Sequence, residues 1–471
     1  MTASPLVFPS DGTGFSGAVL APADAQYDDA RTIFNAMIDK RPSLISQCRT
    51  PQDVAHALAF ARAQGLEVAV RGGGHGVAGT SLTDGGMVID LRQMNGVSVD
   101  AEARTATVGG GATMADLDRA TEPFALATTG GRVSTTGVGG FTLGGGSGWL
   151  DRAFGLACDN VVAAEMVLAD GRIVQVSATE HPDLFWAIHG GGGNFGVVTA
   201  FTFRLYPLAV TTAALLLWPP DRGPEVVRAY RDFIAGAPDA IGGGLLFITG
   251  PDEEFTPPEL VGALTCAVLL VYAGPAAEAE AIWAPMLALG HAGELQVEQP
   301  YADLQSMLDD PPGYRNYWSA EYLDELTDEA IDRFCEHARH MIVPSPSQQA
   351  LFPQGGAVAR GDASFPVPWR GANWCIHPFG LWSDANDDER GRQWTRDLRA
   401  ALRPWATGAT YHNFIGAEGE ARVIASYGPE NYARLAAIKA RYDPQNVFHL
   451  NANIRPAADG GAAEGQLPDH P

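Results

Sequence analysis

The sequence predicts an α+β fold in two main parts, and three observations lead to that prediction. With 471 residues, the chain exceeds the size at which a single hydrophobic core is usual, so two or more domains are expected. Most glycine clusters fall in the first 200 residues, where they separate short runs of β-forming residues. After residue 207 the clusters thin out, and longer strand-like and helix-like runs follow one another.

The first region, residues 1–207, is predicted to contain many short strands. The β-like runs are residues 66–70, 87–91, 105–108, 161–168, 173–176 and 197–205. The Asp170-Gly171 pair is typical of a tight hairpin turn. Residues 51–64 predict an amphipathic helix, because their apolar residues recur at spacings of three and four.

The second region, residues 208–410, predicts a sheet with flanking helices. Its strand-like runs are residues 215–218, 244–248 and 264–272, and its helix-like runs are residues 224–234 and 276–289. A further helix is expected over residues 431–439, within a C-terminal segment of residues 411–456. Residues 457–471 are small, polar and rich in glycine and proline, which predicts a disordered tail.

Composition excludes several classes of protein. A net charge of −24 disfavours binding to nucleic acid or anionic membranes, and no apolar run is long enough to span a bilayer. The N-terminus lacks the basic and apolar regions of a signal peptide, so we expect a cytoplasmic protein. Lys40 and Lys439 are the only lysines, which excludes a P-loop. The cysteines form no C-x-x-C pair, so neither a disulfide framework nor a metal site is expected; they are Cys48, Cys158, Cys266, Cys335 and Cys375.

His75 stands in a glycine turn, Arg71-Gly-Gly-Gly-His75-Gly76, between two β-like runs. Without side chains, such a turn lets the backbone approach a bound ligand closely. Its successive N–H groups can form a nest for an anion such as a diphosphate. The imidazole would then lie against the ligand, where it could make a covalent or catalytic contact.

A second glycine motif does not support a dinucleotide-binding Rossmann fold. Residues 191–196, Gly-Gly-Gly-Asn-Phe-Gly, satisfy the G-x-G-x-x-G pattern. In a Rossmann domain this motif follows a strand and opens a helix. Here a helix-like run precedes it and an alternating, strand-like run follows, so the order is reversed.

Several blocks together resemble a known family. They are Arg71-Gly-Gly-Gly-His75, residues 136–149 (Thr-Gly-Val-Gly-Gly-Phe-Thr-Leu-Gly-Gly-Gly-Ser-Gly-Trp), residues 155–160 (Gly-Leu-Ala-Cys-Asp-Asn), residues 183–198 and residues 442–456. The chain resembles flavoproteins of the vanillyl-alcohol oxidase superfamily. The nearest branch is the berberine-bridge-enzyme-like oxidases, in particular the bacterial branch that resembles 6-hydroxy-D-nicotine oxidase.

The resemblance implies a two-part FAD-binding domain of the vanillyl-alcohol oxidase (PCMH) type and an α+β substrate domain with an antiparallel sheet flanked by helices. The segment 411–456 would return to the FAD domain. His75 would be bonded to a methyl group of the flavin, which raises the flavin's reduction potential. The implied cofactor-binding residues are Arg71, Gly72, Gly73, Gly74, His75, Gly76, Thr136, Gly137, Gly140, Gly145, Gly146, Gly148, Asn160, Gly196, Val197, Asn451 and Asn453.

Many family members have a second link, from a cysteine that precedes the second glycine loop. In this chain Val133 occupies that place, so FAD is expected to be linked once. Cys158 lies beyond the loop and is interpreted as a small buried residue. Thr136 falls where the family controls oxygen access, and its small side chain favours an oxidase.

The implied catalytic residues are Tyr411, Asn413, Tyr317 and Thr136. A phenol has a pKa of about 10, so Tyr411 needs neighbouring positive charge or hydrogen bonds to act as a base. Where many bacterial relatives have a lysine, this chain has Ser319; the arginines considered as substitutes are Arg315, Arg360 and Arg370. His377 is interpreted as a core residue.

The predicted function is an FAD-dependent oxidase that removes hydride from a CH–OH or CH–NH carbon of a small molecule, with dioxygen as the acceptor. Two alternatives stay open. One is a flavin enzyme of secondary metabolism that performs oxidative cyclisation or oxygen insertion. The other is a protein that binds a flavin or a drug without turnover. The sequence identifies neither the substrate nor the oligomeric state.

Overall fold

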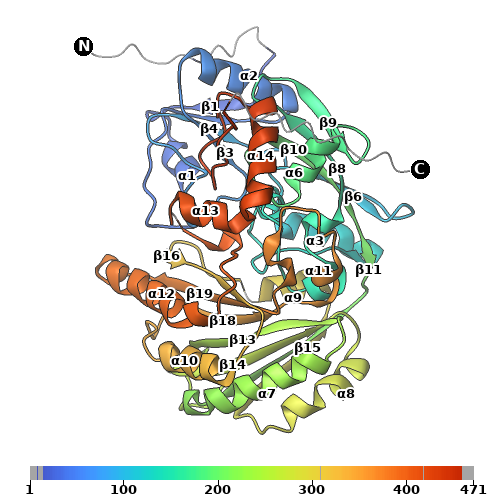
Figure 1. Ribbon diagram of the computed structural model, residues 1–471, viewed down its shortest axis with the longest axis vertical. Coiled ribbons are helices and arrows are strands. Elements are labelled where there is room, and N and C mark those ends of the chain that lie inside the picture. The colour runs from blue at the N-terminus through green and yellow to red at the C-terminus, as the bar shows by residue number, and fades with distance from the viewer. Residues whose placement is uncertain (1–7, 9–13, 308, 417, 459–471) are drawn as a thin grey trace.

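The structure of the chain is a computed structural model that describes residues 8, 14–307, 309–416 and 418–458. Figure 1 shows the sheets of the N-terminal half above a larger sheet, with the last helices running back to the upper part. Most of the predicted tail, residues 459–471, lies outside the described residues.

The first sheet places the glycine turn of His75 at its edge. Its strand order is β1 (Ala18–Leu20), β2 (Leu44–Gln47), β4 (Met87–Asp90) and β3 (Val68–Arg71), with β2, β4 and β3 parallel. Helix α2 (Pro51–Ala63) starts at a capping box of Thr50 and Asp53 and confirms the predicted helix. Because β3 ends at Arg71, the glycine turn begins at the carboxyl end of a parallel strand.

The second sheet is antiparallel and five-stranded. Its order is β5 (Val97–Asp100), β6 (Thr105–Gly109), β10 (Val197–Arg204), β8 (Val161–Val167) and β9 (Ile173–Ser177). The predicted hairpin joins β8 to β9, with Gly171 at φ +87° in its turn. Helix α6 (Pro182–Ile188) precedes the 191–196 glycine motif and β10 follows it, which confirms the reversed order.

The third sheet has eight strands and is antiparallel throughout. Along it lie β15 (Gly293–Gln299), β12 (Thr211–Trp218), β14 (Leu264–Tyr272), β13 (Ile241–Thr249), β18 (Gln348–Pro353), β19 (Trp374–Trp382) and β16 (Arg315–Trp318), and β17 (Glu321–Leu323) also pairs with β19. Figure 1 shows its outer helices; they are α7 (Gly223–Gly236), α8 (Ala276–Leu287), α10 (Asp328–Ala338) and α12 (Asp388–Leu402).

Successive side chains of β12 pack against different parts of the protein. Leu216 and Trp218 pack with residues of α7 and α8, whereas Leu215 and Leu217 belong to a cluster with Trp149 and Leu156 of the first region. Successive strand residues point to opposite faces. The sheet is therefore buried on both sides, and the face opposite the helices is the one that meets the glycine-rich region.

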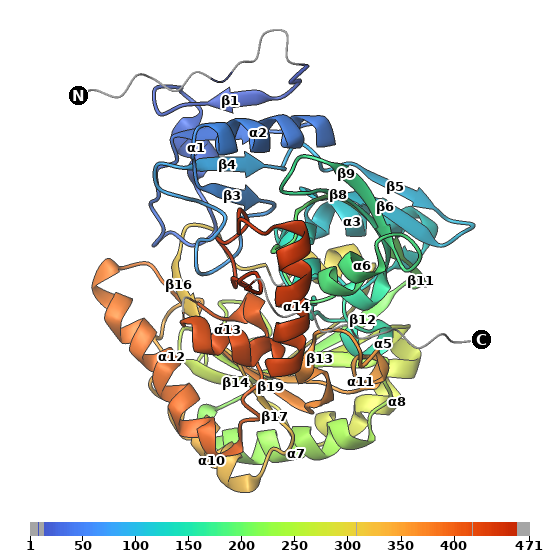
Figure 2. The ribbon, with the colours of Figure 1, turned by 45° about the horizontal axis from the view of Figure 1, so that its top comes forward.

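The short elements that connect these sheets are α1 (Tyr27–Arg31), α3 (Met114–Thr121), β7 (Leu126–Ala127), α4 (Val138–Leu143), α5 (Asp151–Phe154), β11 (Tyr206–Pro207), α9 (Tyr301–Met307) and α11 (Gly356–Arg360). The last two helices are α13 (Glu420–Tyr427) and α14 (Pro429–Tyr442). In Figure 2, α14 runs from the level of the upper sheets down towards α13. Its Leu435 and Ile438 share a buried cluster with Phe195 and Phe201, so the C-terminal segment packs on the N-terminal half.

A buried ion pair secures this C-terminal segment. Lys439 Nζ lies 2.5 Å from Asp443 Oδ2 and also donates to the carbonyl oxygens of Asn194 and Phe448, at 2.6 and 2.9 Å. Asp443 in turn accepts the N–H groups of Val447 and Phe448. These bonds fix the chain just before Asn451.

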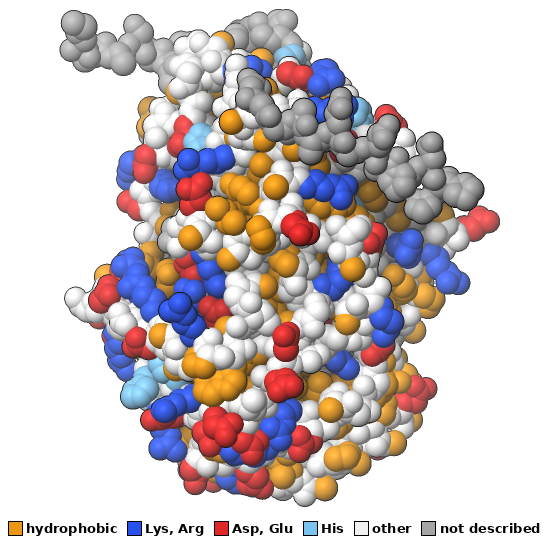
Figure 3. All heavy atoms as spheres, viewed as in Figure 1, with side chains coloured by type: hydrophobic (Ala, Val, Ile, Leu, Met, Phe, Trp, Pro, Cys, Tyr) orange, Lys and Arg blue, Asp and Glu red, His pale blue; other side chains and the backbone are white. Residues whose placement is uncertain are grey.

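The surface in Figure 3 carries charges of both signs, with arginines gathered over the edge where α12 and α10 lie. Arg333, Arg339 and Arg390 belong to this edge and line a groove together with His337 and His340. Within the described part of the chain, no helix is both long and apolar enough to cross a bilayer.

Candidate active site

Two glycine loops interlock at the centre of the site. A Cβ atom added to Gly73 would lie 2.3 Å from the nitrogen of Gly137, and one added to Gly137 would lie 2.1 Å from the nitrogen of Gly73. Neither position has room for a side chain. Gly74 has φ +77°, a conformation that favours glycine.

His75 is held from two sides. Its Nε2 lies 2.9 Å from Thr135 Oγ1, and its ring stacks on Phe34 at a centroid distance of 4.3 Å. Burial lowers the imidazole pKa to about 4, so the ring is neutral at physiological pH. The Nδ1 atom makes no hydrogen bond to a described residue.

Arg71 anchors the first loop. Its guanidinium donates to the carbonyl oxygens of Ala30 and Thr32, and burial lowers its pKa to about 10. Nε of Arg71 has no partner among the described residues. The side chain ties the loop to the segment that carries Phe34, so its place in the structure is that of a loop anchor.

The second loop, residues 131–148, combines open and filled glycine positions. A Cβ on Gly140 would meet no heavy atom within 4 Å, so this backbone faces open space. A Cβ on Gly146 would lie 2.5 Å from Ala157 Cβ, and one on Gly148 would lie 1.7 Å from Gly130 O. Those two glycines are needed for internal packing, and so is Gly145, which adjoins Trp369 and has φ +122°.

Tyr411 is the polar centre of the site. The Gly146 N–H (3.1 Å) and Asn413 Nδ2 (2.9 Å) both donate to its phenol oxygen. Burial raises the pKa of Tyr411 despite these bonds, so the phenol is protonated at neutral pH. Its own O–H has no acceptor among the described residues. The Tyr411 phenol therefore keeps its proton as a donor, on a side chain that is fully buried.

Asn413 connects Tyr411 to the second loop. Its Nδ2 also lies 3.2 Å from Gly140 O and 3.1 Å from Phe141 O. A Cβ on Gly144 would collide with the amide at 2.3 Å. His75 and Tyr411 thus contact opposite ends of one loop, at Thr135 and Gly146.

Aromatic rings surround Tyr411. Trp369 and Phe414 pack on it at centroid distances of 5.2 and 4.7 Å, and His377 stacks on Phe414 at 3.9 Å. His377 Nδ1 lies 2.7 Å from Ser319 O, so Nδ1 is the protonated nitrogen and Nε2 keeps its lone pair. Burial lowers the pKa of His377 to about 3, and its Nε2 makes no hydrogen bond to a described residue.

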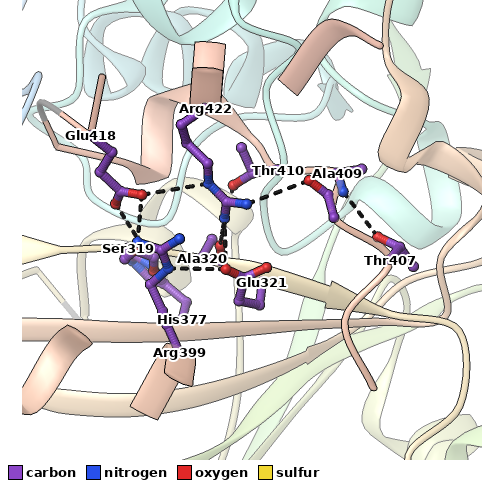
Figure 4. Close-up of polar contacts among 11 residues, drawn as sticks. Ser319, Ala320, Glu321, His377, Arg399, Thr407, Ala409, Thr410, Glu418 and Arg422 are labelled. Atoms are coloured by element: carbon purple, nitrogen blue, oxygen red, sulfur yellow. Dashed lines mark hydrogen bonds and ion pairs between the residues drawn. The ribbon is translucent and has the colours of Figure 1, made fainter. Parts of the chain in front are cut away.

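Ser319 belongs to a network of buried charges rather than replacing an ammonium group. Its hydroxyl donates to Glu418 Oε1 at 2.7 Å, and Glu418 Oε2 lies 2.6 Å from Arg399. Arg422 pairs with Glu321 at 2.9 Å and donates to Ala320 O at 2.7 Å. In Figure 4 the side chains of Arg399 and Arg422 lie between the two carboxylates. Opposite charges are present in equal number, and the network fixes the approach of residues 407–411 to the sheet.

The three arginines considered as substitutes for a lysine are all engaged elsewhere, which corrects that expectation. Arg315 pairs with Asp388 at 2.5 Å, Arg360 with Asp239 at 2.6 Å and Arg370 with Asp159 at 2.6 Å.

Arg132 is the cation that sequence reasoning missed. Its guanidinium lies 3.9 Å from the Phe352 ring centroid and donates to the carbonyl oxygens of Ser147 and Gly148. Burial raises the pKa of Tyr411 and lowers that of His377, and the positive charge of Arg132 opposes the first shift and adds to the second. Its position directly before Val133 in the second loop is the signal that could have identified it.

The structure places Tyr317 and Trp318 on opposite faces of β16. Strand β16 alternates, so Asn316 and Trp318 face the segment of Phe34, with Trp318 stacked on Phe34 at 6.2 Å. Tyr317 points the other way, under Arg396 of α12. The ring that reaches the His75 side is therefore Trp318.

Of the remaining predicted cofactor residues, some are engaged in contacts within the protein and others keep a polar atom available for a ligand. The side chain of Asn160 bonds within the protein. Its Nδ2 donates to Phe154 O and Leu156 O, and its Oδ1 accepts from Tyr206 OH. A Cβ on Gly196 would lie 2.8 Å from Val167 O, and Val197 opens strand β10. Asn451 and Asn453, in contrast, each keep a buried Oδ1 that has no partner within the part of the chain that the structure describes.

The geometry fits a large ligand that carries phosphates and hydrogen-bonding rings. Gly140 and Gly193 present open backbone, and the buried Nε2 of His412 has no partner in the described ranges of the chain. The backbone of Thr136 bonds within the protein: its N–H donates to Val133 O, and its carbonyl oxygen accepts from the Met114 N–H. Among the described residues, no group of three His, Cys, Asp or Glu side chains could hold a metal ion.

The chain is similar to known proteins over nearly its whole length. A family model described as FAD binding domain matches residues 42–177, and one described as berberine and berberine like matches residues 410–455. The (R)-6-hydroxynicotine oxidase of Paenarthrobacter nicotinovorans is 32% identical over 457 residues, which cover 93% of this chain and 97% of that protein. An FAD-linked oxidoreductase of Bacillus subtilis is 30% identical over 457 residues, which cover 94% of this chain and 98% of the relative.

Solved structures show the same architecture. The 6-hydroxy-D-nicotine oxidase of Arthrobacter nicotinovorans superposes with a TM-score of 0.84 at 28% identity, covering 95% of this chain and all (100%) of the other. Glucooligosaccharide oxidase of Acremonium strictum, whose FAD is 6-S-cysteinyl and 8α-N1-histidyl, shares the fold with a TM-score of 0.82 at 23% identity, covering 94% of this chain and 98% of the other.

Fold and site together define an FAD-linked oxidoreductase of the vanillyl-alcohol oxidase type. The chain belongs to the berberine-bridge-enzyme-like family, and FAD is its cofactor.

Proposed function

We propose that this protein is an oxidase that removes hydride from a CH–OH or CH–NH carbon of a small molecule, passes the electrons to dioxygen and releases hydrogen peroxide. The observation that carries the proposal is Tyr411, whose oxygen accepts two hydrogen bonds while its own O–H stays free. Bound FAD supplies the hydride acceptor. Thr136, with its small side chain, is assigned to oxygen access.

Covalent attachment of FAD through His75 is part of this proposal. The imidazole is neutral, its Nδ1 is free, and both neighbouring loops are fixed. Val133 offers no thiol, so we propose a single link. The cofactor would rest against the open backbone of Gly140 and Gly193 and the free amide oxygens of Asn451 and Asn453.

Tyr411 and His377 receive complementary roles. Tyr411 donates its proton towards the substrate heteroatom, because its oxygen already accepts from Gly146 and Asn413. His377 can accept a hydrogen bond from the substrate, because its Nδ1–H is committed to Ser319 O and Nε2 keeps its lone pair. The two rings both pack on Phe414, so one hydrogen-bond donor and one acceptor lie on either side of it.

Reduction of the bound flavin tests this function. A panel of secondary alcohols and amines is mixed with the protein without oxygen, and loss of the flavin absorbance is recorded. We expect one class to bleach the flavin and, in air, to yield one hydrogen peroxide per substrate. Less than one peroxide would favour oxidative cyclisation or oxygen insertion. Failure of every compound to bleach the flavin would contradict turnover and favour a binding protein.

Acid precipitation tests the covalent link. We expect the pellet of the wild type to stay yellow and that of His75→Ala to lose its flavin. We also propose a cytoplasmic location, which the five free, buried cysteines support. Fractionation of the native host would test it.

A further inference from the structure

We propose that Thr135 is a positioning residue for flavin attachment: its hydroxyl fixes the tautomer of His75 and takes the ring proton when the bond to the flavin forms. The inference rests on the covalent link proposed above. It goes further, because it assigns attachment a second residue, one that touches His75 directly.

The contacts of His75 set the orientation of its ring. Thr135 Oγ1 lies 2.9 Å from Nε2, and Phe34 covers one face of the ring at 4.3 Å. Phe34 is itself held, since its N–H donates to Gly74 O at 3.2 Å. Neighbouring Asn35 bonds to Val77 O and Asn316 O at 2.8 and 3.1 Å. Rotation of the imidazole would break the contact with Thr135 and unstack the ring.

We assign Nδ1 as the nucleophile, because the Thr135 hydroxyl can accept the proton of Nε2. A neutral imidazole has one N–H and one lone pair. When Nε2 donates to Thr135 Oγ1, the lone pair is on Nδ1, the nitrogen without a protein partner. Without the hydroxyl, the two tautomers would compete for the same position.

The attachment step balances with dioxygen as the oxidant. The Nδ1 lone pair forms a bond to the methyl carbon of the flavin ring, and that carbon loses one hydrogen as a proton. The Nε2 proton, made acidic by the new bond, leaves through the Thr135 hydroxyl, which is exposed at the loop surface. The electron pair of the broken C–H bond passes through the flavin to dioxygen, which takes up both protons and becomes hydrogen peroxide.

The second loop gives Thr135 a defined position. Thr136 N–H donates to Val133 O at 3.0 Å, and the neighbouring Ser134 N–H donates to Asp309 Oδ1 at 2.6 Å. Gly137 follows directly and interlocks with Gly73. Thr135 and His75 are thus carried on two loops that cannot slide past each other.

Thr135→Val and Thr135→Ser form the test, with Thr142→Val as the matched control. Thr142 lies in helix α4 of the same loop region, and its hydroxyl has no partner among the described residues. Each purified protein is saturated with FAD in air. Total bound flavin is measured by absorbance, and attached flavin by acid precipitation and intact mass over time.

We expect Thr135→Val to bind FAD fully but attach it about tenfold more slowly or worse, as the loss of a hydrogen bond to a group that becomes charged implies. Thr135→Ser and Thr142→Val should attach it as the wild type does. NMR of the flavin peptide should place the bond on Nδ1. Wild-type attachment rates in Thr135→Val, a bond on Nε2, or loss of all FAD binding in Thr135→Val would overturn the inference. A wild type that releases all its flavin in acid would instead contradict the link through His75.

Discussion

Gly73 and Gly137 lie backbone against backbone, although 64 residues separate them in the sequence. The distance from a Cβ on either residue to the other's nitrogen would be 2.3 or 2.1 Å, far below van der Waals contact. The loop that carries His75 and the loop that carries Thr135 therefore have one relative position. Both loops need glycine at this point for packing within the protein, before any ligand is considered.

Alanine at Gly73 or Gly137 should separate the two loops. We expect Gly73→Ala and Gly137→Ala to bind FAD weakly and to attach little of it, because His75 would move away from Thr135. Gly96→Ala is the control, since a Cβ there meets no atom within 4 Å. Flavin content per protein, from the absorbance of purified samples, measures the effect. A full complement of attached FAD in both loop variants would contradict this account.

Tyr411→Phe should lower kcat/KM by about 10²- to 10⁴-fold, the usual contribution of a positioned acid or base. The ring would still pack on Trp369 and Phe414, so folding and flavin content should not change. Tyr230→Phe is a matched control, because that buried hydroxyl on α7 has no partner among the described residues. Asn413→Ala should have a smaller effect, since Gly146 N–H still donates to Tyr411. Steady-state kinetics on the substrate found by flavin bleaching decides between these outcomes.

Two neutral histidines predict how stability depends on pH. Burial lowers the pKa of His377 to about 3 and that of His412 to about 4, from an ordinary value of 6.5. Below pH 6.5 the unfolded chain binds protons that the folded chain does not. Stability should therefore be full above pH 6.5 and fall as the pH decreases towards 4, by up to about 1.4 kcal/mol per pH unit for each histidine.

Urea unfolding of the holoprotein at pH 7.0 and 5.5 measures this effect. His377→Asn should reduce the difference between the two pH values, whereas the exposed His340→Asn should leave it unchanged. An equal pH effect in all three proteins would show that His377 is protonated in the folded state.

Local patterns were enough to predict much of the fold. Helix α2, the β8–β9 hairpin and the strands of the second region follow from apolar periodicity and turn residues, which act over a few positions. The reversed order around residues 191–196 was predicted from the same signals. Strand pairing within the eight-stranded sheet, where β18 lies between β13 and β19, depends on long-range packing that no short window contains.

The site was harder to predict, because side chains from distant segments decide it. Trp318 and Tyr317 are adjacent, and only the pairing of β16 with β19 shows which of them faces Phe34. No local pattern distinguishes Arg132 from the other arginines. Its position in the site depends on its contact with Phe352, which is 220 positions away in the sequence. Asn160 belongs to a recognisable block, but its hydrogen bonds are internal.

Lys439 should be essential to the C-terminal segment. Lys439→Met would leave Asp443 buried without its cation, a change that typically costs about 3–5 kcal/mol. Because Lys439 also bonds to Asn194 O and Phe448 O, the loop of Asn451 should loosen and FAD binding should weaken. Lys40→Met, at the only other lysine, is the control for the loss of a charge. Thermal unfolding and flavin content together test this prediction, and an unchanged Tm for Lys439→Met would refute it.

Arg132 contributes both a charge and a clamp, and two substitutions separate them. Its charge offsets a small part of the rise that burial causes in the pKa of Tyr411, whereas its two NH₂ groups donate to Ser147 O and Gly148 O at 3.1 and 3.3 Å. Arg132→Lys keeps the charge and loses the paired NH₂ groups. Arg132→Met loses both, but Asp151, 3.8 Å away, keeps its bonds to the Ser147 hydroxyl and the Gly148 N–H.

If the charge matters most, Arg132→Lys should keep most of the wild-type kcat/KM, and Arg132→Met should lose about tenfold or more, the scale of one charge interaction in a partly buried site. If the clamp matters most, both variants should lose Tm and flavin content to a similar degree. Arg390→Met, on the exposed face of α12, controls for the loss of an arginine. We expect Arg132→Lys to keep most of the activity. The charge of Arg132 contributes to the pKa values of Tyr411 and His377, and Asp151 still bonds to the Ser147 hydroxyl when Arg132 is replaced. Equal kcat/KM in all four proteins would remove Arg132 from the site.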